Sequence, residues 1–526
     1  MRLSYFITFL SVFSFWYATA NANIFYRGND GDPETLDHHG TSTTSEARLM
    51  DDLYSGLVDF SENAKVIPGT AERWDISKDG LIYTFYLRDD AFWSNGDPVT
   101  AHDFVFAYRR LMNPLTAAKY ATLLYPIKNA EKVNIGELDL LELGIRALDD
   151  KTFIIELEQA TPYFLEQLTH QTGKPLHQKS VEALGDQFVK PGNLVTNGAY
   201  VLQSYTLNSR IVMTKNDYFY DAENVAIEEL HYIPFEDRST CVRAWEAGEV
   251  HICSDLPAQD LERLKIYKDS LRIVPYLGTY YYALNTTDEF LSDPEIRRAM
   301  SMVIDREFLS EEIWPGMIPA QSLVPLGINN YPLGSPNTDY FNMSMLDRED
   351  EAIAIMARKG ISKDRPVTVE LMYNSGENHK NTATAIADMW SEIGIKITYK
   401  IRDAAAHYAY LRDLGEVQVA RAGWIGDYSD PYNFLFLLES DNTGFNYARY
   451  NNPEYDALMD RASNELDLNK RAEILQKAEK IIMKATPFLP IFYYSSFTLV
   501  SPEIENWKSN VMNKNPTRFL SFRTSG

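Results

Sequence analysis

The chain has 526 residues, a hydrophobic content of 45% and a formal net charge of −24. This length predicts about three domains and leaves room for a large core without metal clips. The excess of acidic residues argues against a nucleic-acid partner, which needs a basic face, and against docking on anionic lipid.

The N-terminal segment has the pattern of a secretory signal peptide. A short positive start at Met1-Arg2 precedes an apolar run from Leu3 to Tyr17 and a small-x-small cleavage site at 20–22. A membrane anchor is the alternative, but the run is short and no basic flank follows it. We expect cleavage near Ala22, a location in a bacterial periplasm, and a mature chain whose formal charge, without Arg2, is −25.

Strand and helix patterns alternate along the mature chain without a fixed period, which predicts a mixed α/β fold. Thr100 with Asp103, and Asp293 with Pro294, are the expected starts of two helices. No linker, charge block or repeat separates the elements, so the domains are expected to be interleaved. In chain order, the clearest runs are a helix at 45–54, a strand at 83–87, a helix at 101–111, strands at 152–157 and 210–213, a helix at 293–304, a strand at 367–372, a helix at 382–393, a strand at 395–399 and a helix at 470–485.

Cys241 and Cys253 are the only cysteines. The first belongs to a predicted helix at 240–247 and the second to a predicted strand at 250–253. A helix that returns antiparallel onto this strand would bring the two sulfurs together, and an oxidising compartment permits a disulfide. Two buried thiols fit the pattern equally well. Two cysteines without clustered histidines do not make a zinc site.

The motifs of common enzyme classes are missing. The sequence has no G-x-S-x-G, H-E-x-x-H, Walker or G-x-G-x-x-G motif, and its nine histidines are scattered. Spacing alone does not decide whether two of the 74 acidic residues form a glycosidase pair. We therefore expect no catalytic residue, no metal and no cofactor, and the composition favours a binding protein.

Several motifs occur in a characteristic order and spacing. The most diagnostic are the block from Trp93 to Phe104 and the block from Arg421 to Tyr428. Together they resemble the extracellular solute-binding proteins, family 5, of peptide ABC importers, and most closely the periplasmic oligopeptide-binding proteins. The other matching segments are 36–37, 53–57, 68–74, 83–88, 196–200, 247–250, 279–282 and Asn285.

The resemblance implies an α/β fold of the three-lobed periplasmic-binding-protein type (Venus-flytrap, class II, cluster C), with two mixed-sheet ligand lobes and an extra inserted lobe. Lobe I would combine residues 23–54, 178–277 and 496–526. Lobe II would be the insertion 55–177, and lobe III would be 278–495. Ligand would bind between lobes I and III, which would close about two strands crossing at 276–278 and 493–495.

The resemblance also implies a set of peptide-binding residues. Asp427 would pair with the ligand's amino group, because a buried ammonium needs a carboxylate. Arg421, Arg412 and His379 would lie around ligand side chains and carboxylate, which Arg can hold with two hydrogen bonds. Backbone contacts, which give affinity without reading side chains, are implied at Ser42, Thr44, Gly423 and Ile425. The aromatic or phenolic positions of the pocket are Tyr120, Trp424, Tyr281 and Tyr494. The polar positions of the cleft are Asn446 and Asp255.

Some positions depart from the family pattern. Gly278 and Ile425 occupy positions that a disulfide often links in related proteins. Ala283 and Ala405 replace larger pocket residues, and Asp255 and Asp413 add carboxylates. We expect from these changes a ligand preference for bulky or cationic side chains.

The resulting prediction is a non-enzymatic, monomeric receptor. It would capture oligopeptides and deliver them to an ABC permease in the inner membrane. The alternatives are the same fold with another ligand (a dipeptide, murein peptide, haem, nickel chelate or peptide antibiotic) and, from a different class, a peptidase-type enzyme.

Overall fold

The structure is a computed structural model that describes residues 24–257, 260–332, 334–442 and 444–523, the side chains of 404 and 405 excepted. The predicted signal peptide and the side chain of Ala405 lie outside the described residues. Within the described ranges, no helix has the length and apolarity needed to cross a bilayer.

A mixed eleven-stranded sheet runs through the molecule, and it confirms the predicted α/β class. Its order is β15-β14-β16-β12-β17-β11-β1-β10-β9-β8, with β13 paired to β17. The sheet contains both parallel pairs, such as β1–β10, and antiparallel pairs, such as β10–β9. The strands are β1 (Ile24–Asn29), β8 (Tyr200–Thr206), β9 (Arg210–Lys215), β10 (Glu229–Pro234), β11 (Ile252–Ser254), β12 (Leu271–Leu284), β13 (Ile318–Pro319), β14 (Val367–Asn374), β15 (Ile395–Arg402), β16 (Val419–Ile425) and β17 (Phe488–Val500).

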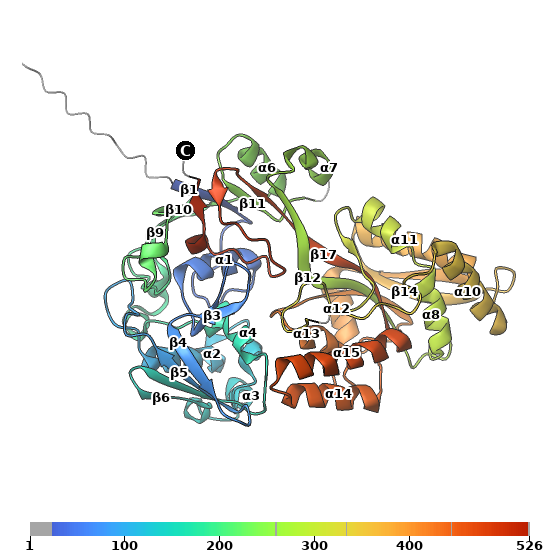
Figure 1. Ribbon diagram of the computed structural model, residues 1–526, viewed down its shortest axis with the longest axis horizontal. Helices are drawn as coiled ribbons and strands as arrows, with labels where there is room; N and C mark the ends of the chain where they lie inside the picture. The colour runs from blue at the N-terminus through green and yellow to red at the C-terminus, as the bar shows by residue number, and fades with distance from the viewer. Residues whose placement is uncertain (1–23, 258–259, 333, 443, 524–526) are drawn as a thin grey trace, which may run out of the picture.

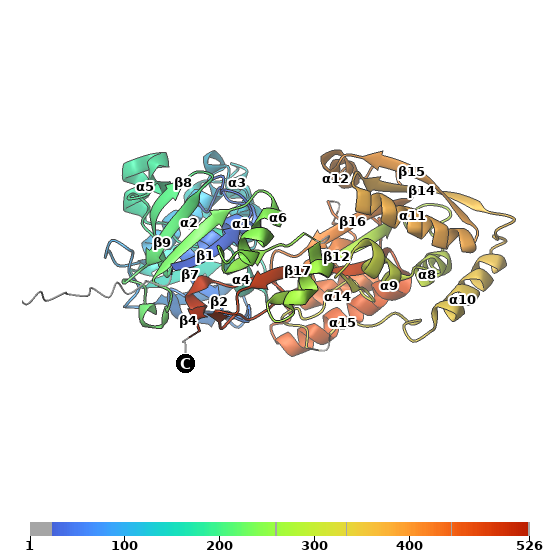
Figure 2. The ribbon, with the colours of Figure 1, turned by 90° about the horizontal axis from the view of Figure 1, so that it is seen from above.

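The two longest strands, β12 and β17, connect the two halves of the molecule (Figures 1 and 2). They pair antiparallel along Leu271–Pro275 and again along Thr279–Ala283, with the register broken between these stretches. At the break, the Leu277 N–H donates to the Val511 carbonyl at 2.9 Å and the Leu277 carbonyl accepts from the Gly426 N–H at 2.8 Å. We define half A as residues 24–275 and 495–523, and half B as residues 279–493. A broken ladder between two packed halves is a place where a sheet can bend.

Half A contains a second, four-stranded sheet, β4-β5-β7-β6, against which α2 packs. Phe104 of α2 and Phe153 of β7 belong to the same apolar core as Phe25 of β1 and Tyr232 of β10. The segment predicted as lobe II therefore shares its core with the segment predicted as lobe I, and the lobe boundaries stay a prediction. The α-helices and strands of half A outside the large sheet are β2 (Val58–Phe60), β3 (Val66–Pro68), β4 (Ala71–Ile76), β5 (Ile82–Leu87), β6 (Ile145–Asp149), β7 (Thr152–Glu156), β18 (Ile504–Glu505), β19 (Ser521–Phe522), α1 (Thr44–Leu53), α2 (Ala101–Met112), α3 (Ala130–Asn134), α4 (Phe164–Leu168), α5 (Gln178–Leu184), α6 (Arg238–Glu246) and α7 (Leu261–Leu264).

In half B, helices cover both faces of the sheet (Figure 1). Side chains alternate along a strand, so Tyr280 and Tyr282 of β12 enter one core with α8, α10 and α11. Tyr281, between them, enters the opposite core with α13, α14 and α15. The helices of half B are α8 (Pro294–Met302), α9 (Arg306–Phe308), α10 (Met345–Arg358), α11 (Glu377–Glu392), α12 (Ala404–Arg412), α13 (Tyr432–Leu435), α14 (Pro453–Asn464) and α15 (Leu468–Ala485).

Both predicted helix starts are confirmed. Asp293 caps α8 by accepting a hydrogen bond from the Glu295 N–H, with Pro294 as the first helical residue. At the start of α2, the Thr100 N–H donates to the Asp103 carboxylate at 2.9 Å. These bonds satisfy N–H groups that have no partner within a helix.

Cys241 of α6 and Cys253 of β11 form a disulfide, with Cα atoms 5.9 Å apart. The structure thus decides between the two alternatives that the sequence left open. The Cys241 sulfur lies against β1 at Gly28, where an added Cβ would come within 2.4 Å of it. The bond therefore fixes α6 to the sheet of half A.

Replacing both cysteines by alanine is expected to lower the free energy of unfolding by about 3 kcal/mol, because the disulfide closes a loop of 12 residues and restricts the unfolded chain. Urea denaturation of the wild type and the variant would measure this difference. Reduced wild type serves as the control and should behave like the variant. A variant as stable as the oxidised wild type would contradict the prediction.

Candidate functional site

A cavity of about 150 Å³ lies where the two halves meet. Five of the residues predicted from the sequence line it: Ser42, Thr44, Tyr120, Ile425 and Asp427. They come from three separate segments of the chain, which the fold brings together. The other lining residues, which were not predicted as ligand-binding residues, are Thr43, Ala47, His170, Gln171, Tyr276, Leu277, Gly426, Met512 and Lys514.

The start of α1 forms the half A wall of this cavity. The buried carboxylate of Glu46 accepts hydrogen bonds from the N–H groups of Ser42 at 2.8 Å, Thr43 at 3.0 Å and Glu34 at 3.0 Å. Burial alone would raise the pKa of Glu46, but these donors hold it below its ordinary value. The loop is thereby fixed, and the N–H of Thr44, the first residue of α1, has no acceptor within the helix.

The half B wall is the edge of β16. This strand pairs with β12 along its whole length but with β14 only at Val419 and Ala420. The segment from 421 to 425 therefore has one edge to which an extended chain can add. An added Cβ at Gly423 would come within 2.8 Å of the Tyr494 hydroxyl, so a larger residue there would displace this side chain. Gly278 and Ile425 face each other in the ladder.

Asp427 follows directly after this edge. Its side chain is accessible to solvent, yet the surrounding protein raises its pKa to about 6. Among the described residues, no basic side chain lies within ion-pair distance of it. Across the cavity, burial raises the pKa of Tyr120, and the negative charge of Asp427 raises it further. Asp427 is thus a cavity-lining carboxylate without an ion-pair partner among the described residues.

Arg421 is the first residue of this edge segment, and its side chain is buried. Its guanidinium donates to the Asn374 side chain at 2.8 Å, the Tyr408 hydroxyl at 2.7 Å and the Tyr494 hydroxyl at 3.4 Å. It also lies over the ring of Tyr280, 4.5 Å from its centroid. All four partners are neutral, so its charge has no counter-ion among the described residues.

His379 lies beside Arg421. Its Nδ1 is 3.2 Å from the Tyr280 hydroxyl, and its ring packs against Tyr280 and Trp314. Burial, together with the charge of Arg421, lowers the pKa of His379 to about 4. The ring is therefore neutral near pH 7 and forms a polar region with the tyrosines around Arg421.

The structure places Trp424 and Tyr281 on the opposite face of the sheet. Trp424 is half-buried, and its indole N–H donates to the Asn433 side chain at 3.1 Å. Tyr281 is fully buried and stacks on Phe488, with ring centroids 4.2 Å apart. Neither residue lines the cavity in this conformation.

Asn446 and Arg412 are also set apart from the cavity. The buried amide of Asn446 bonds to its own loop, donating to the carbonyls of Glu439 and Tyr450 and accepting from the Tyr450 N–H. Arg412 is exposed in the last turn of α12. Asn446 therefore shapes a loop, and Arg412 faces solvent.

The expectation that Asp255 adds an available carboxylate for cationic ligand side chains is corrected by the structure. The Asp255 carboxylate forms an ion pair with buried Arg48 at 2.5 Å. Burial would raise its pKa, but Arg48 outweighs this and holds the pKa below its ordinary value. Because Arg48 compensates the charge, Asp255 does not supply an unpaired carboxylate for a cationic ligand side chain. Asp413 is exposed and Ala283 is buried in a core, so neither supports the predicted preference.

A second contact joins the halves near Asp427. The ring of Tyr163 in half A stacks on Tyr428 at 5.0 Å and on Tyr432 at 5.1 Å. Nearby, the Asn329 side-chain amide of half B donates to buried Glu166 of α4 at 3.4 Å. The loop that carries Asp427 is therefore held by aromatic packing against half A.

Glu166 is expected to make stability depend on pH. Burial, with the charge of Asp430, raises its pKa to about 8, whereas an unfolded glutamate ionises near 4.3. The folded chain thus binds the extra proton, so this stabilising contribution is complete below about pH 4 and is lost as the pH rises to about 8. We expect Glu166→Gln to remove this loss and to raise the unfolding free energy at pH 8 by about 2–4 kcal/mol.

Denaturation midpoints measured from pH 5 to 9 would test this prediction. The exposed Glu137→Gln is the control and should follow the wild type at every pH. A Glu166→Gln curve parallel to the wild type would show that Glu166 does not titrate in this range.

Two α/β halves joined by long crossing strands, with a cavity at their junction, define the bilobal binding-protein class of fold. The model for bacterial extracellular solute-binding proteins, family 5 middle region, matches residues 65–446. The chain belongs to this family. It is 33% identical to the periplasmic oligopeptide-binding protein OppA of Salmonella typhimurium, over 94% of this chain and 91% of that protein.

Two solved structures are similar over nearly the whole chain. The unliganded open form of the murein tripeptide binding protein MppA is 32% identical, with a TM-score of 0.88 over 96% of this chain and 98% of that one. Haemophilus influenzae OppA in complex with the peptide RPPGFSPFR is 34% identical, with a TM-score of 0.72 over 95% and 99%. At nearly equal identity, this structure superposes better on the unliganded open form than on the peptide complex.

Proposed function

We propose that the protein is a periplasmic receptor that captures oligopeptides between halves A and B and delivers them to an ABC permease in the inner membrane. It acts as a monomer, after removal of the signal peptide near Ala22, and catalyses no reaction. The observation that carries this proposal is the placement of Asp427, a carboxylate without an ion-pair partner among the described residues, at the end of the unpaired edge of β16.

These two features match the chemistry of a peptide terminus. A free amino group is cationic and pairs with Asp427, while the backbone that follows adds to the edge of β16 at Gly423 and Ile425. On the opposite wall, the N–H of Thr44 is available to the same backbone. A ligand that touches both walls stabilises the closed arrangement of the halves, because those contacts do not exist together in the open one.

Native mass spectrometry of protein purified from its own periplasm would test the proposal. We expect a series of co-purified peptide masses, released on denaturation. One non-peptide mass would instead favour another ligand for the same fold, and turnover of added peptide would favour an enzyme. Either result would overturn the proposal.

A further inference from the structure

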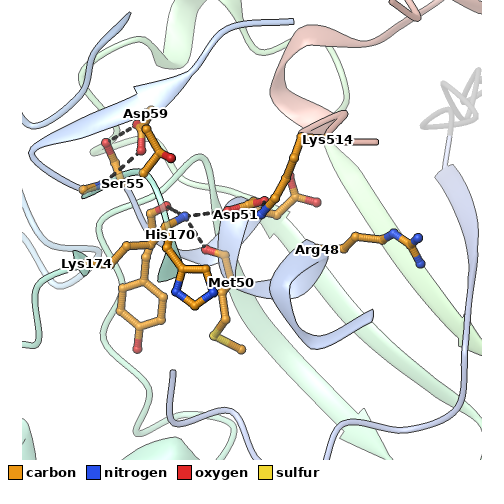
Figure 3. A network of polar contacts seen from close by, with 12 residues as sticks. Arg48, Met50, Asp51, Ser55, Asp59, His170, Lys174 and Lys514 are labelled. Carbon is orange, nitrogen blue, oxygen red and sulfur yellow. Dashed lines mark hydrogen bonds and ion pairs between the residues drawn. The ribbon is translucent and has the colours of Figure 1, made fainter. Parts of the chain in front are cut away.

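The cavity that contains Asp427 also contains a cation. Lys514, in the chain that follows β17, lines the same cavity, and its ammonium donates to the Asp51 carboxylate at 2.9 Å. Figure 3 shows Lys514, Asp51 and Lys174 together, with His170 beside them. The side chain of Lys514 is 15% exposed, so it is held firmly but remains in contact with the cavity.

The positive charge of this cluster exceeds its negative charge. Asp51 is shared by Lys514 and by Lys174, whose ammonium lies 2.9 Å from it. The two lysines outweigh burial and hold the pKa of Asp51 far below its ordinary value, so the carboxylate is ionised. Two ammonium groups around one carboxylate leave one positive charge uncompensated within the cluster.

Lys514 is the member of the cluster with donors to spare. Lys174 directs its ammonium to Asp51 and to the carbonyls of Met50 at 3.2 Å and Tyr54 at 3.0 Å, which uses all three of its N–H groups. In the described ranges of the chain, Lys514 has only the Asp51 carboxylate as an acceptor. Two of its N–H groups are therefore free for an anion in the cavity.

His170 adds a neutral donor to the same wall. Burial lowers its pKa to about 3, so the ring carries one proton. Its Nδ1 accepts a hydrogen bond from the Thr172 N–H at 3.4 Å, which places the proton on Nε2. The ring lines the cavity and packs against Tyr120, with centroids 4.9 Å apart.

We propose that Lys514 and His170 form an anion subsite that selects peptides whose first residue has a carboxylate side chain. The inference rests on the proposed function, since it takes the ligand's amino group to be at Asp427. A cavity of about 150 Å³ holds both Asp427 and Lys514, so a carboxylate at Lys514 lies close to the bound ammonium. A first residue of Asp or Glu supplies both charges. The other source of this chemistry is the C-terminal carboxylate of a dipeptide.

Calorimetric titration with Glu-Ala-Ala, Gln-Ala-Ala and Ala-Ala-Ala tests the proposal. For the wild type, we expect about tenfold tighter binding of the Glu peptide than of the isosteric Gln peptide, from a charge-assisted hydrogen bond. Lys514→Met should abolish this ratio, and it leaves Asp51 paired one-to-one with Lys174. Lys508→Met, an exposed change in the same segment, is the matched control and should keep the ratio.

The outcomes distinguish a failure of the anion subsite from a failure of the proposed receptor function. If all three peptides bind with equal affinity, or if the ratio persists in Lys514→Met, the subsite is wrong while the receptor function stands. If none of them binds, the proposed function fails and the subsite fails with it. If Ala-Ala, but not its C-terminal amide, binds in a Lys514-dependent manner and the Glu peptide shows no advantage, the anion is a C-terminus, which also overturns the proposal.

Discussion

Asp427→Asn is expected to weaken the binding of a tripeptide with a free amino terminus by about 2–5 kcal/mol, or roughly thirtyfold to several thousandfold. The reason is that closure of the halves surrounds the ligand's ammonium with protein, and the described residues around Asp427 offer no other carboxylate as a hydrogen-bond partner for it. The amide of Asn is similar in shape but has no charge. Titration calorimetry of the wild type and the variant with Ala-Ala-Ala measures the difference.

The same pair predicts a pH dependence of binding. The pKa of Asp427 is about 6 in the ligand-free protein, and a nearby ammonium stabilises the ionised carboxylate and lowers this pKa in the complex. Binding below about pH 6 must therefore release a proton, so affinity falls as the pH falls through 6. The ligand's α-amino group ionises near 7.7–8.0, so affinity also falls above that range. Asp427→Asn should lose the acidic limb and keep the alkaline one.

Two controls make this prediction specific. Asp413→Asn removes an exposed carboxylate of half B and should bind as the wild type does. An N-acetylated tripeptide lacks the cation and should bind equally weakly to the wild type and to Asp427→Asn. An unchanged affinity in Asp427→Asn for the free peptide would refute the role of this carboxylate.

The predicted residues that line the cavity were implied by the family resemblance, which rests on motifs in a fixed order along the chain. Ile425 and Asp427 belong to one such motif, and Ser42 and Thr44 directly precede the helix predicted at 45–54. A local pattern is enough to place such residues, because neighbouring residues on one strand or loop move together into the fold. The helices and strands were predicted for the same reason, since hydrophobic periodicity is a local property.

Two of the cavity residues that were not predicted, Lys514 and His170, are single side chains outside the long helices and strands. Lys514 and His170 have no motif around them, and they meet only because β17 returns the chain to half A. The compensation of Asp255 by Arg48 was also out of reach, because 207 residues separate the partners. The position of Tyr281 depends on strand alternation at a point where the β12 ladder changes register. In each case a long-range contact decides the outcome.

Arg471→Met is expected to lower the free energy of unfolding by about 3–5 kcal/mol, because it leaves a buried carboxylate without its partner. Arg471 of α15 donates through both terminal nitrogens to Asp430, at 2.7 and 2.8 Å. Both side chains are 0% exposed. Asp430 also accepts from the Tyr432 N–H at 2.9 Å, so the pair fixes the turn between Asp427 and α13.

The expected effect extends to binding, since this turn carries Asp427 and holds Tyr428 against Tyr163. Urea denaturation and titration with Ala-Ala-Ala should therefore show a loss of stability and a weaker affinity in the same variant. Lys470→Met, at an exposed neighbouring position of α15, should change neither. Adding Asp430→Asn to Arg471→Met removes the unpaired charge and should recover part of the stability. A double variant less stable than the single one would show that packing, rather than the lone carboxylate, accounts for the loss.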